Sequence, residues 1–319
     1  MAFLLFTAVG IGGGGEAAAH PRPPRPTALQ AYSERAAERS GAAGVSGAPP
    51  APELVPLPAR AFDAPIAAYR GYAARQLAAM AVPLAQLRRA LAADQRGAAR
   101  AAWEVAYADY LHLGAVYGEF GALNSAIDGT PGGLPGGADD PHFTGLHRIE
   151  LGLWHSAVPP HRLLGAAAQL TANVHLLRRR LPYEQITPLE YATRAHEILE
   201  DAIRDLLSGV DVPWSDAGVL ATAAGVSATH ELITTLRPLL DGREDAIEVL
   251  DSALTRLDGV LATLRRAHHG RWPTLAQLSQ REGELLNGAV GAAVEALDQV
   301  PGALETKLPP AIPTLPKPR

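Results

Sequence analysis

The feature that most constrains this chain is a series of helical hydrophobic patterns that runs from Phe62 to about Val300. No convincing alternation of apolar and polar residues, which would indicate a β-strand, interrupts it. Alanine supplies much of the 47% hydrophobic fraction, and aromatic residues make up only 5% of the chain. Because alanine is the best helix former and a poor strand former, the sequence predicts an all-α fold of closely packed helices.

Start and stop signals divide this region into seven or eight helices. The clearest start is Thr187-Pro188-Leu189-Glu190, which combines an N-cap threonine, a first-position proline and a capping-box glutamate. Asp63 and Ser215 are further predicted N-caps. Short connections make antiparallel neighbours. We therefore predict two packed up-and-down four-helix bundles, pseudo-duplicated but without a visible sequence repeat, in a domain of residues 61–300 with halves at about 61–182 and 183–300.

The two ends of the chain differ from this body in composition. Residues 1–19 combine a short apolar run with Ala17-Ala18-Ala19, which is typical of a signal peptide, although no Lys or Arg precedes the run. Residues 20–60 form a linker rich in Pro, Ala and Gly, and residues 301–319 form a Pro-rich tail. The apolar run is too short for a stable membrane span. We expect an exported protein of the periplasm or extracytoplasmic cell envelope.

Charge and cysteine content exclude several classes of function. The net charge is −5 and no stripe of Lys and Arg is present, so nucleic acid is not an expected partner. The chain has no cysteine, which excludes disulfides, thiolate metal sites and iron–sulfur clusters. Any metal must therefore take nitrogen and oxygen ligands, which favours iron, zinc, manganese or calcium.

His147 and Glu150 are the leading candidates for such ligands. Three residues apart on a helix, they share one face, with Cβ atoms about 5–6 Å apart, so that both side chains can converge on one cation. By itself the pattern is weak, and the alternative is a His–Glu pair bonded to each other or to water. The metalloprotease motif His-Glu-x-x-His is absent, and its inverse is broken at Leu151.

The surrounding segment is more specific. Residues 143–154 read Phe-Thr-Gly-Leu-His-Arg-Ile-Glu-Leu-Gly-Leu-Trp and closely resemble the motif of the imelysin-like family, in particular its EfeO and EfeM branch of envelope iron-uptake proteins. The resemblance covers about residues 62–300 and is sharp only over 143–154. It implies a pair of helical bundles with a metal-binding cleft between them, in the short form that lacks a cupredoxin-like domain.

The same resemblance implies a set of ligands. His147 and Glu150 would be the first two, and Asp128 matches the acidic position that ends the preceding helix. Glu197 and Asp201 fall in the matching acidic region of the second half, although an exposed acidic face is the alternative reading.

Departures from the family motif weaken a site for trivalent iron. The family's Tyr-Glu-x-x-Glu is replaced by Tyr110-Leu111-His112-Leu113-Gly114, and a further acidic position holds Asn124. Hard cations prefer anionic oxygen, so the loss of carboxylates disfavours ferric iron. His112 is a possible substitute ligand, which would shift the preference towards ferrous iron or zinc.

Three functions follow from these residues. The first is a non-catalytic metal-binding protein, most simply for iron, that works with an iron permease and a haem peroxidase, as the resemblance implies. The second is a helical binding or scaffold module for a protein or envelope polymer, with a degenerate site. The third, a metallopeptidase, is disfavoured because it needs three protein ligands, an open position for water and a general base.

Overall fold

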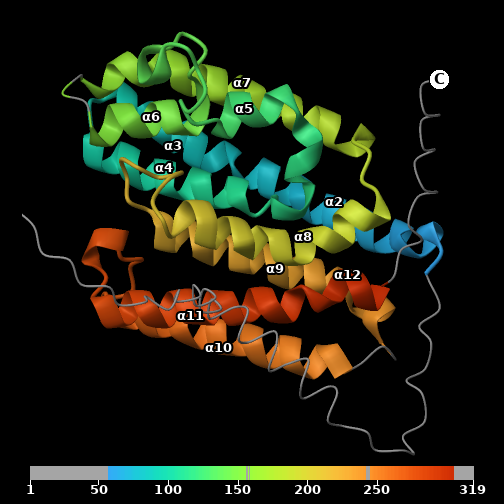
Figure 1. The fold of residues 1–319 in the computed structure, drawn as a ribbon. Coiled ribbons are helices and arrows are strands. Elements are labelled where there is room, and N and C mark those ends of the chain that lie inside the picture. The colour runs from blue at the N-terminus through green and yellow to red at the C-terminus, as the bar shows by residue number, and fades with distance from the viewer. Residues whose placement is uncertain (1–56, 156, 158, 242–244, 305–319) are drawn as a thin grey trace, which may run out of the picture. The chain divides into compact units, whose positions relative to one another are not determined.

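The helical periodicity of the sequence becomes a layered stack of helices in the computed structural model (Figure 1). The structure describes residues 57–155, 157, 159–241 and 245–304. These residues contain helices and no β-sheet, so the prediction of an all-α fold is confirmed. They belong to one unit of contacts, Leu54–Arg319.

The first half of the described chain supplies six α-helices with short 3-10 segments between them. In chain order these elements are η1 (Ala59–Phe62), α2 (Asp63–Ala79), α3 (Ala81–Ala92), α4 (Arg96–Leu111), η2 (Gly114–Phe120), α5 (Ala122–Asp128), η3 (Gly137–Asp139), α6 (Gly145–Trp154), η4 (Pro160–Leu163), α7 (Leu164–Arg180) and η5 (Leu181–Tyr183).

The second half continues with longer helices. They are α8 (Pro188–Asp201), which runs directly into the π-helical turn η6 (Ala202–Leu206), α9 (Gly218–Leu240), α10 (Asp245–Ala267), η7 (Leu275–Gln277), α11 (Gln280–Leu297) and α12 (Gln299–Leu304).

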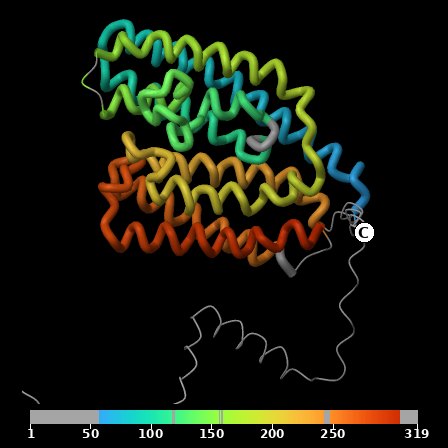
Figure 2. The backbone as a smooth tube through the Cα atoms, turned by 45° about the horizontal axis from the view of Figure 1, so that its top comes forward, coloured from blue at the N-terminus to red at the C-terminus, as the bar shows by residue number. Residues whose placement is uncertain are grey.

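The helices of the two halves form two adjacent groups (Figure 2). Within the first group α3 packs on α4 and α7, and α6 packs on α4, α5 and α7. Within the second group α8 packs on α9 and α11, and α10 packs on α11. The groups meet where α4 and α2 pack against α9. Contacts between α9 and α10 are sparse although the two helices are consecutive, so the second group departs from a closed up-and-down bundle.

Large aromatic side chains fill the core beside α6. Trp103 and Tyr107 of α4 are almost completely buried and stack at 4.9 Å between ring centroids. The indole Nε1 of Trp103 donates a hydrogen bond to the carbonyl of Leu146 at 2.8 Å. A buried Trp N–H needs such a partner, so this bond ties the first turn of α6 to α4.

The starts of two helices show where local signals succeed and fail. Thr187 and Glu190 form the predicted capping box at the start of α8, with both reciprocal hydrogen bonds present. Ser215, in contrast, does not cap a helix, and α9 begins only at Gly218. The physical reason is that the Ser215 hydroxyl bonds a carboxylate on α6, at 2.6 Å, instead of a backbone amide of its own helix.

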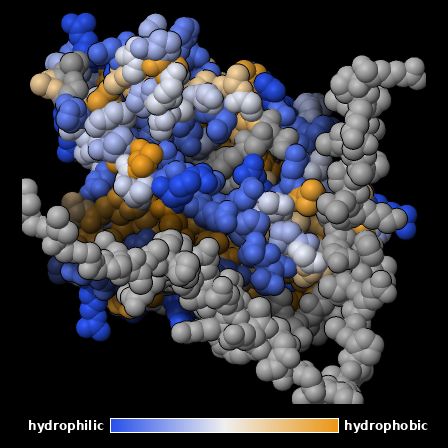
Figure 3. All heavy atoms as spheres, in the orientation of Figure 1, coloured by the Kyte–Doolittle hydropathy of each residue, from blue (hydrophilic) through white to orange (hydrophobic). Residues whose placement is uncertain are grey.

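Where the atoms in Figure 3 are coloured, polar residues predominate on the displayed face, with apolar patches between them. In the described part of the chain, no helix is both long and apolar enough to cross a membrane. The predicted signal peptide at 1–19, most of the predicted linker at 20–60 and most of the tail at 301–319 lie outside the described residues.

Candidate metal site

Helix α6 is held tightly at both ends. At its start Gly145 has φ +80°, and a Cβ at this position would lie 2.2 Å from the carbonyl oxygen of Ile127. At its end the Arg96 guanidinium donates to the carbonyl of Gly152 at 2.8 Å, and Arg96 and Arg100 both donate to that of Leu153. The close approach at Gly145 needs a residue without a side chain, and it brings α6 against the end of α5.

His147 lies in this helix between two carboxylates. Its side chain is only 1% exposed, with Nδ1 2.8 Å from Glu150 Oε2 and Nε2 3.2 Å from Asp128 Oδ1. The edge of its ring also contacts Tyr107, at 5.5 Å between centroids. The two carboxylates lie at opposite edges of the imidazole, so His147 and Glu150 do not converge on a common cation position as the spacing alone predicts.

Glu150 is fully buried and its oxygens are engaged. Oε2 contacts His147, while Oε1 accepts hydrogen bonds from the Ser215 amide at 2.8 Å, the Ser215 hydroxyl at 2.6 Å and the Trp214 amide at 3.4 Å. A buried carboxylate is stable only when it is paired and hydrogen-bonded in this way. Glu150 therefore supports His147 from the side that faces the second half of the chain.

The two carboxylates change the protonation of His147. Burial alone would lower the pKa of the imidazole, but the contacts with Asp128 and Glu150 offset it and raise the pKa to about 10. The imidazole therefore carries a proton on each ring nitrogen at neutral pH, with Nδ1 hydrogen-bonded to Glu150 and Nε2 in an ion-pair contact with Asp128.

A cavity of about 390 Å³ lies on the Asp128 side of His147. Four aspartates line it, together with Asn124, Leu111 and Arg194; the aspartates are Asp128, Asp201, Asp205 and Asp211.

The charge in this cavity is not balanced in the metal-free protein. Asp128 Oδ1 is a buried atom with no hydrogen-bond partner among the described residues, and its approach to His147 is an ion-pair contact. Burial, and then repulsion from Asp128 and Asp205, raises the pKa of the Asp211 carboxyl to about 6. A buried oxygen without a hydrogen bond and mutually repelling carboxylates are the environment that a cation would stabilise.

The remaining predicted ligands lie in different places. Asp201 reaches the cavity but pairs with Arg204 at 2.6 Å. Glu197 does not line the cavity and pairs with Arg194 at 2.9 Å. His112 lies away from it, edge-on to Tyr72 at 6.4 Å. The structure thus brings together His147, Glu150 and Asp128, adds Asp201 at the cavity wall, and does not bring Glu197 or His112 to this wall.

Two acidic residues of the cavity are absent from the prediction. Asp205 follows Asp201 by four residues, and this spacing on one helical face is a signal that the sequence contains. Asp211 lies in the connection between η6 and α9, where no periodicity indicates which way a side chain points. Among the described residues, no group of three or more His, Asp or Glu side chains is arranged to hold a metal ion without movement.

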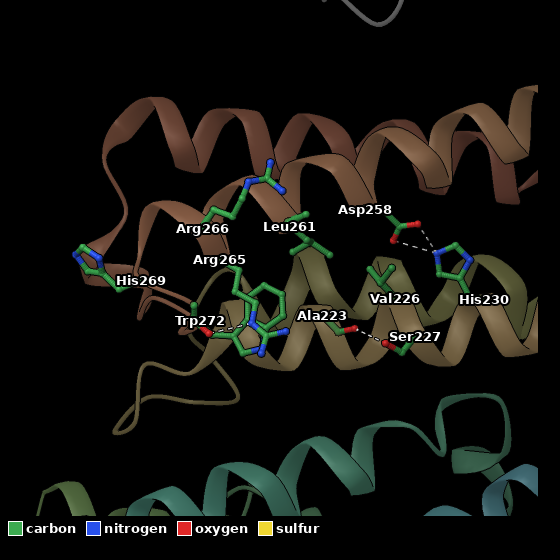
Figure 4. A pocket seen from close by; sticks show the side chains of 12 residues that line it. Ala223, Val226, Ser227, His230, Asp258, Leu261, Arg265, Arg266, His269 and Trp272 are labelled. Atoms are coloured by element: carbon green, nitrogen blue, oxygen red, sulfur yellow. Dashed lines mark hydrogen bonds and ion pairs between the residues drawn. The ribbon is translucent and has the colours of Figure 1, made fainter.

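A separate groove of about 710 Å³ runs between α9 and α10 (Figure 4). Figure 4 shows His230 of α9 facing Asp258 of α10 at one end, and Arg265 beside Trp272 at the other. Val226 and other apolar side chains line the middle. This groove includes none of the residues around His147 and belongs to the gap that the sparse α9–α10 packing leaves.

The chain is similar in sequence to components of iron uptake systems. The chain is 24% identical over 250 residues to the iron uptake system component EfeO of Yersinia pseudotuberculosis, which covers 77% of this chain and 65% of that protein. It is 23% identical over 240 residues to the protein of the same description in Escherichia coli K12, which covers 75% of this chain and 63% of that protein. The chain thus spans a little under two thirds of the length of these relatives. No family model matches it.

Proposed function

We propose that this chain, a distant relative of the EfeO components of iron uptake systems, is an exported iron-binding protein that carries iron as cargo and catalyses no reaction. The observation that carries the proposal is the cavity beside His147: four aspartates line it, and one of them, Asp128, contacts the histidine Nε2 at 3.2 Å. Hard and borderline cations such as ferrous and ferric iron prefer this set of oxygen and nitrogen donors.

Asp128 and Nε2 of His147 are the proposed direct ligands, because Asp128 lines the cavity, Nε2 lies 3.2 Å from its Oδ1, and that oxygen has no hydrogen-bond partner among the described residues. Asp201, Asp205 and Asp211 would complete the coordination after their side chains move, since two of them now pair with Arg204. Glu150 acts behind the histidine. A metal-binding histidine commonly donates its second N–H to a carboxylate, which fixes the orientation of the ring.

The peptidase alternative is weaker than cargo binding. Hydrolysis on a metal needs a general base near the bound water, and Glu150, the carboxylate of the motif, already accepts bonds from Ser215, Trp214 and His147. Partners of the proposed function are an iron permease and a haem peroxidase of the same uptake system, and the proposed compartment is the periplasm or the outer side of the cell envelope.

One observation favours a second candidate, a binding or scaffold module whose metal site has degenerated. Leu111 and Asn124, which stand at two of the positions where the family motif has carboxylates, both line the cavity. The Asn124 amide oxygen accepts a hydrogen bond from Tyr110 at 2.7 Å. The missing charges therefore belong to this cavity, and they weaken it most for the trivalent ion.

Calorimetric titration of the chain with ferrous, ferric and zinc ions tests the proposal. Saturable binding to the wild-type chain is expected, and Asp128→Asn and His147→Gln should each weaken it at least tenfold. Asp258→Asn is the matched control. It also removes one negative charge, but in the α9–α10 groove, and it should leave the affinity unchanged. No saturable binding of any of the three ions would overturn the proposal in favour of the scaffold module.

A further inference from the structure

Ser215 lies in the connection between η6 and α9, on the opposite side of Glu150 from His147. Its hydroxyl donates to Glu150 Oε1 at 2.6 Å and its amide donates to the same oxygen at 2.8 Å. Ser215 is itself only 5% exposed. An uninterrupted chain of contacts therefore runs from Ser215 through the buried Glu150 and His147 to the partly exposed Asp128, which lines the cavity.

The backbone around Ser215 is fixed by contacts of its own. Asp216 adopts φ +58°, and its carbonyl and carboxylate accept hydrogen bonds from the amides of Leu275 and Ala276, at 3.1 and 2.7 Å. Trp214 packs against Phe143, at 6.0 Å between ring centroids. A donor on a rigid, buried backbone is pre-organised to bond Glu150. The hydroxyl of an exposed serine would instead form hydrogen bonds with water.

We infer that Ser215 is a positioning residue for the proposed metal site: through Glu150 it fixes the orientation of the His147 ring so that Nε2 faces Asp128. This inference rests on the proposed function, since it deepens the same site. Glu150 has two acceptor oxygens, and Ser215 occupies one of them with two donors. With Oε1 held by these donors the carboxylate cannot rotate freely, and this fixes the position of Oε2, which contacts Nδ1 of His147.

The position of Ser215 in the chain adds a second consequence. The segment 207–217 also carries Asp211, which lines the cavity on the Nε2 side. This one short connection therefore supports the Nδ1 side of the histidine, through Ser215 and Glu150, and contributes Asp211 to the cavity on its Nε2 side. The geometry of a site on α5 and α6 is in this way set by a segment that belongs to neither helix.

The test compares the full chain with Ser215→Ala, Ser215→Thr and Ser208→Ala. Ser208 is an exposed serine of the same segment that bonds only local backbone, so its variant is the matched control. The first readout is the NMR signal of the His147 Nδ1 proton in the metal-free protein, assigned by its loss in His147→Gln. The second is the affinity for ferrous and zinc ions by calorimetry.

Ser215→Ala should speed solvent exchange of the Nδ1 proton at least tenfold and weaken metal binding about tenfold, in the range found for residues that support a metal ligand. Ser215→Thr, which keeps the hydroxyl, should restore both, and Ser208→Ala should change neither. An unchanged Nδ1 signal in Ser215→Ala would overturn the positioning role. If the wild-type chain binds none of the ferrous, ferric and zinc ions, the proposed function fails, while the NMR comparison still decides the role of Ser215.

Discussion

His147 illustrates how one side chain can face two environments. Its Nδ1 edge meets a carboxylate that three other groups hold in place, and its Nε2 edge meets a carboxylate at a cavity. The imidazole therefore stabilises the metal-free protein as a cation between Glu150 and Asp128. A metal ion at Nε2 would take the place of that cation's outward proton.

The pKa of His147 predicts a dependence of stability on pH. The folded-state pKa of about 10 lies above the ordinary 6.5, so the stabilisation is fully present below pH 6.5 and is lost as the pH rises through 10. In this window the free energy of unfolding should fall by about 1.4 kcal/mol per pH unit. Urea unfolding of the metal-free chain at pH 7, 8 and 9 measures the slope.

The control for this slope is His147→Gln, which keeps hydrogen-bonding capacity but does not titrate. Its free energy of unfolding should be lower than that of the wild-type chain at pH 7 and much flatter between pH 7 and 9. Equal slopes in the two proteins would show that other groups, and not His147, govern the alkaline loss of stability.

Leu111 offers a test of what the cavity has lost. Leu111→Glu returns a carboxylate to the cavity wall, so the affinity for ferric iron should rise at least tenfold while the metal-free protein becomes less stable. Val105→Glu is the matched control, because Val105 lies on the same helix and is 51% exposed. Calorimetry with ferric ion measures the affinity and thermal unfolding measures the stability. If Leu111→Glu bound ferric ion no more tightly than Val105→Glu, this result would contradict the proposal that the cavity is the metal site.

At the scale of elements, the close contact between α5 and α6 decides whether the site exists. Asp128 ends α5 and His147 lies in the first turn of α6, so their distance depends on how nearly the two helix ends approach. Gly145 permits this approach. The arginines of α4 then hold the other end of α6, so that the helix has little freedom to shift.

Gly145→Ala should therefore damage both the fold and the site. The added Cβ would lie 2.2 Å from a backbone oxygen, at a φ of +80° that alanine rarely adopts. We expect a loss of roughly 2 kcal/mol or more in the free energy of unfolding, and a lower metal affinity, because α6 must move away from α5. Denaturant unfolding and calorimetry measure the two effects.

Gly259→Ala is the control for this substitution. Gly259 lies inside α10, and nothing described stands within 4 Å of a Cβ there. Alanine is the better helix former, so this variant should be more stable by about 0.5–1 kcal/mol and should bind metal normally. A Gly145→Ala variant as stable as the wild-type chain would show that α6 tolerates a wider approach to α5.

At the scale of the whole molecule, the cavity draws its walls from both groups of helices. Asp128 and Leu111 come from the first group, and Asp201, Asp205 and Asp211 come from the end of α8, from η6 and from the connection that follows. A cation bound there links the two groups. Ligand binding to the folded state alone stabilises it by about 2.7 kcal/mol at a hundredfold excess over Kd.

Thermal unfolding with and without metal tests this link. The metal should raise Tm in a concentration-dependent way, and Asp211→Asn should reduce that increase by at least half, because it removes a proposed ligand contributed by the second group. Asp298→Asn, at an exposed position after α11, should leave the increase unchanged. An increase in Tm that survives Asp211→Asn intact would confine the binding site to the first group.

Local interactions explain the part of the structure that the sequence determined by itself. Helical periodicity predicted the all-α fold, and Thr187 with Glu190 predicted the start of α8, since both patterns arise between residues only three or four positions apart. The pairing of His147 with Glu150 follows from the same short range. The ligand assignments of the site remain predictions.

Tertiary packing decided the rest, because it depends on which distant surfaces meet. Ser215 reads as a helix cap in the sequence, yet its hydroxyl serves a carboxylate 65 residues away. Asp211 lies in a connection without periodicity and faces the cavity all the same, whereas His112 is directed elsewhere. Whether Glu150 faces the cavity or supports the histidine from behind depends on the segment packed against it, and no local pattern in the sequence encodes that contact.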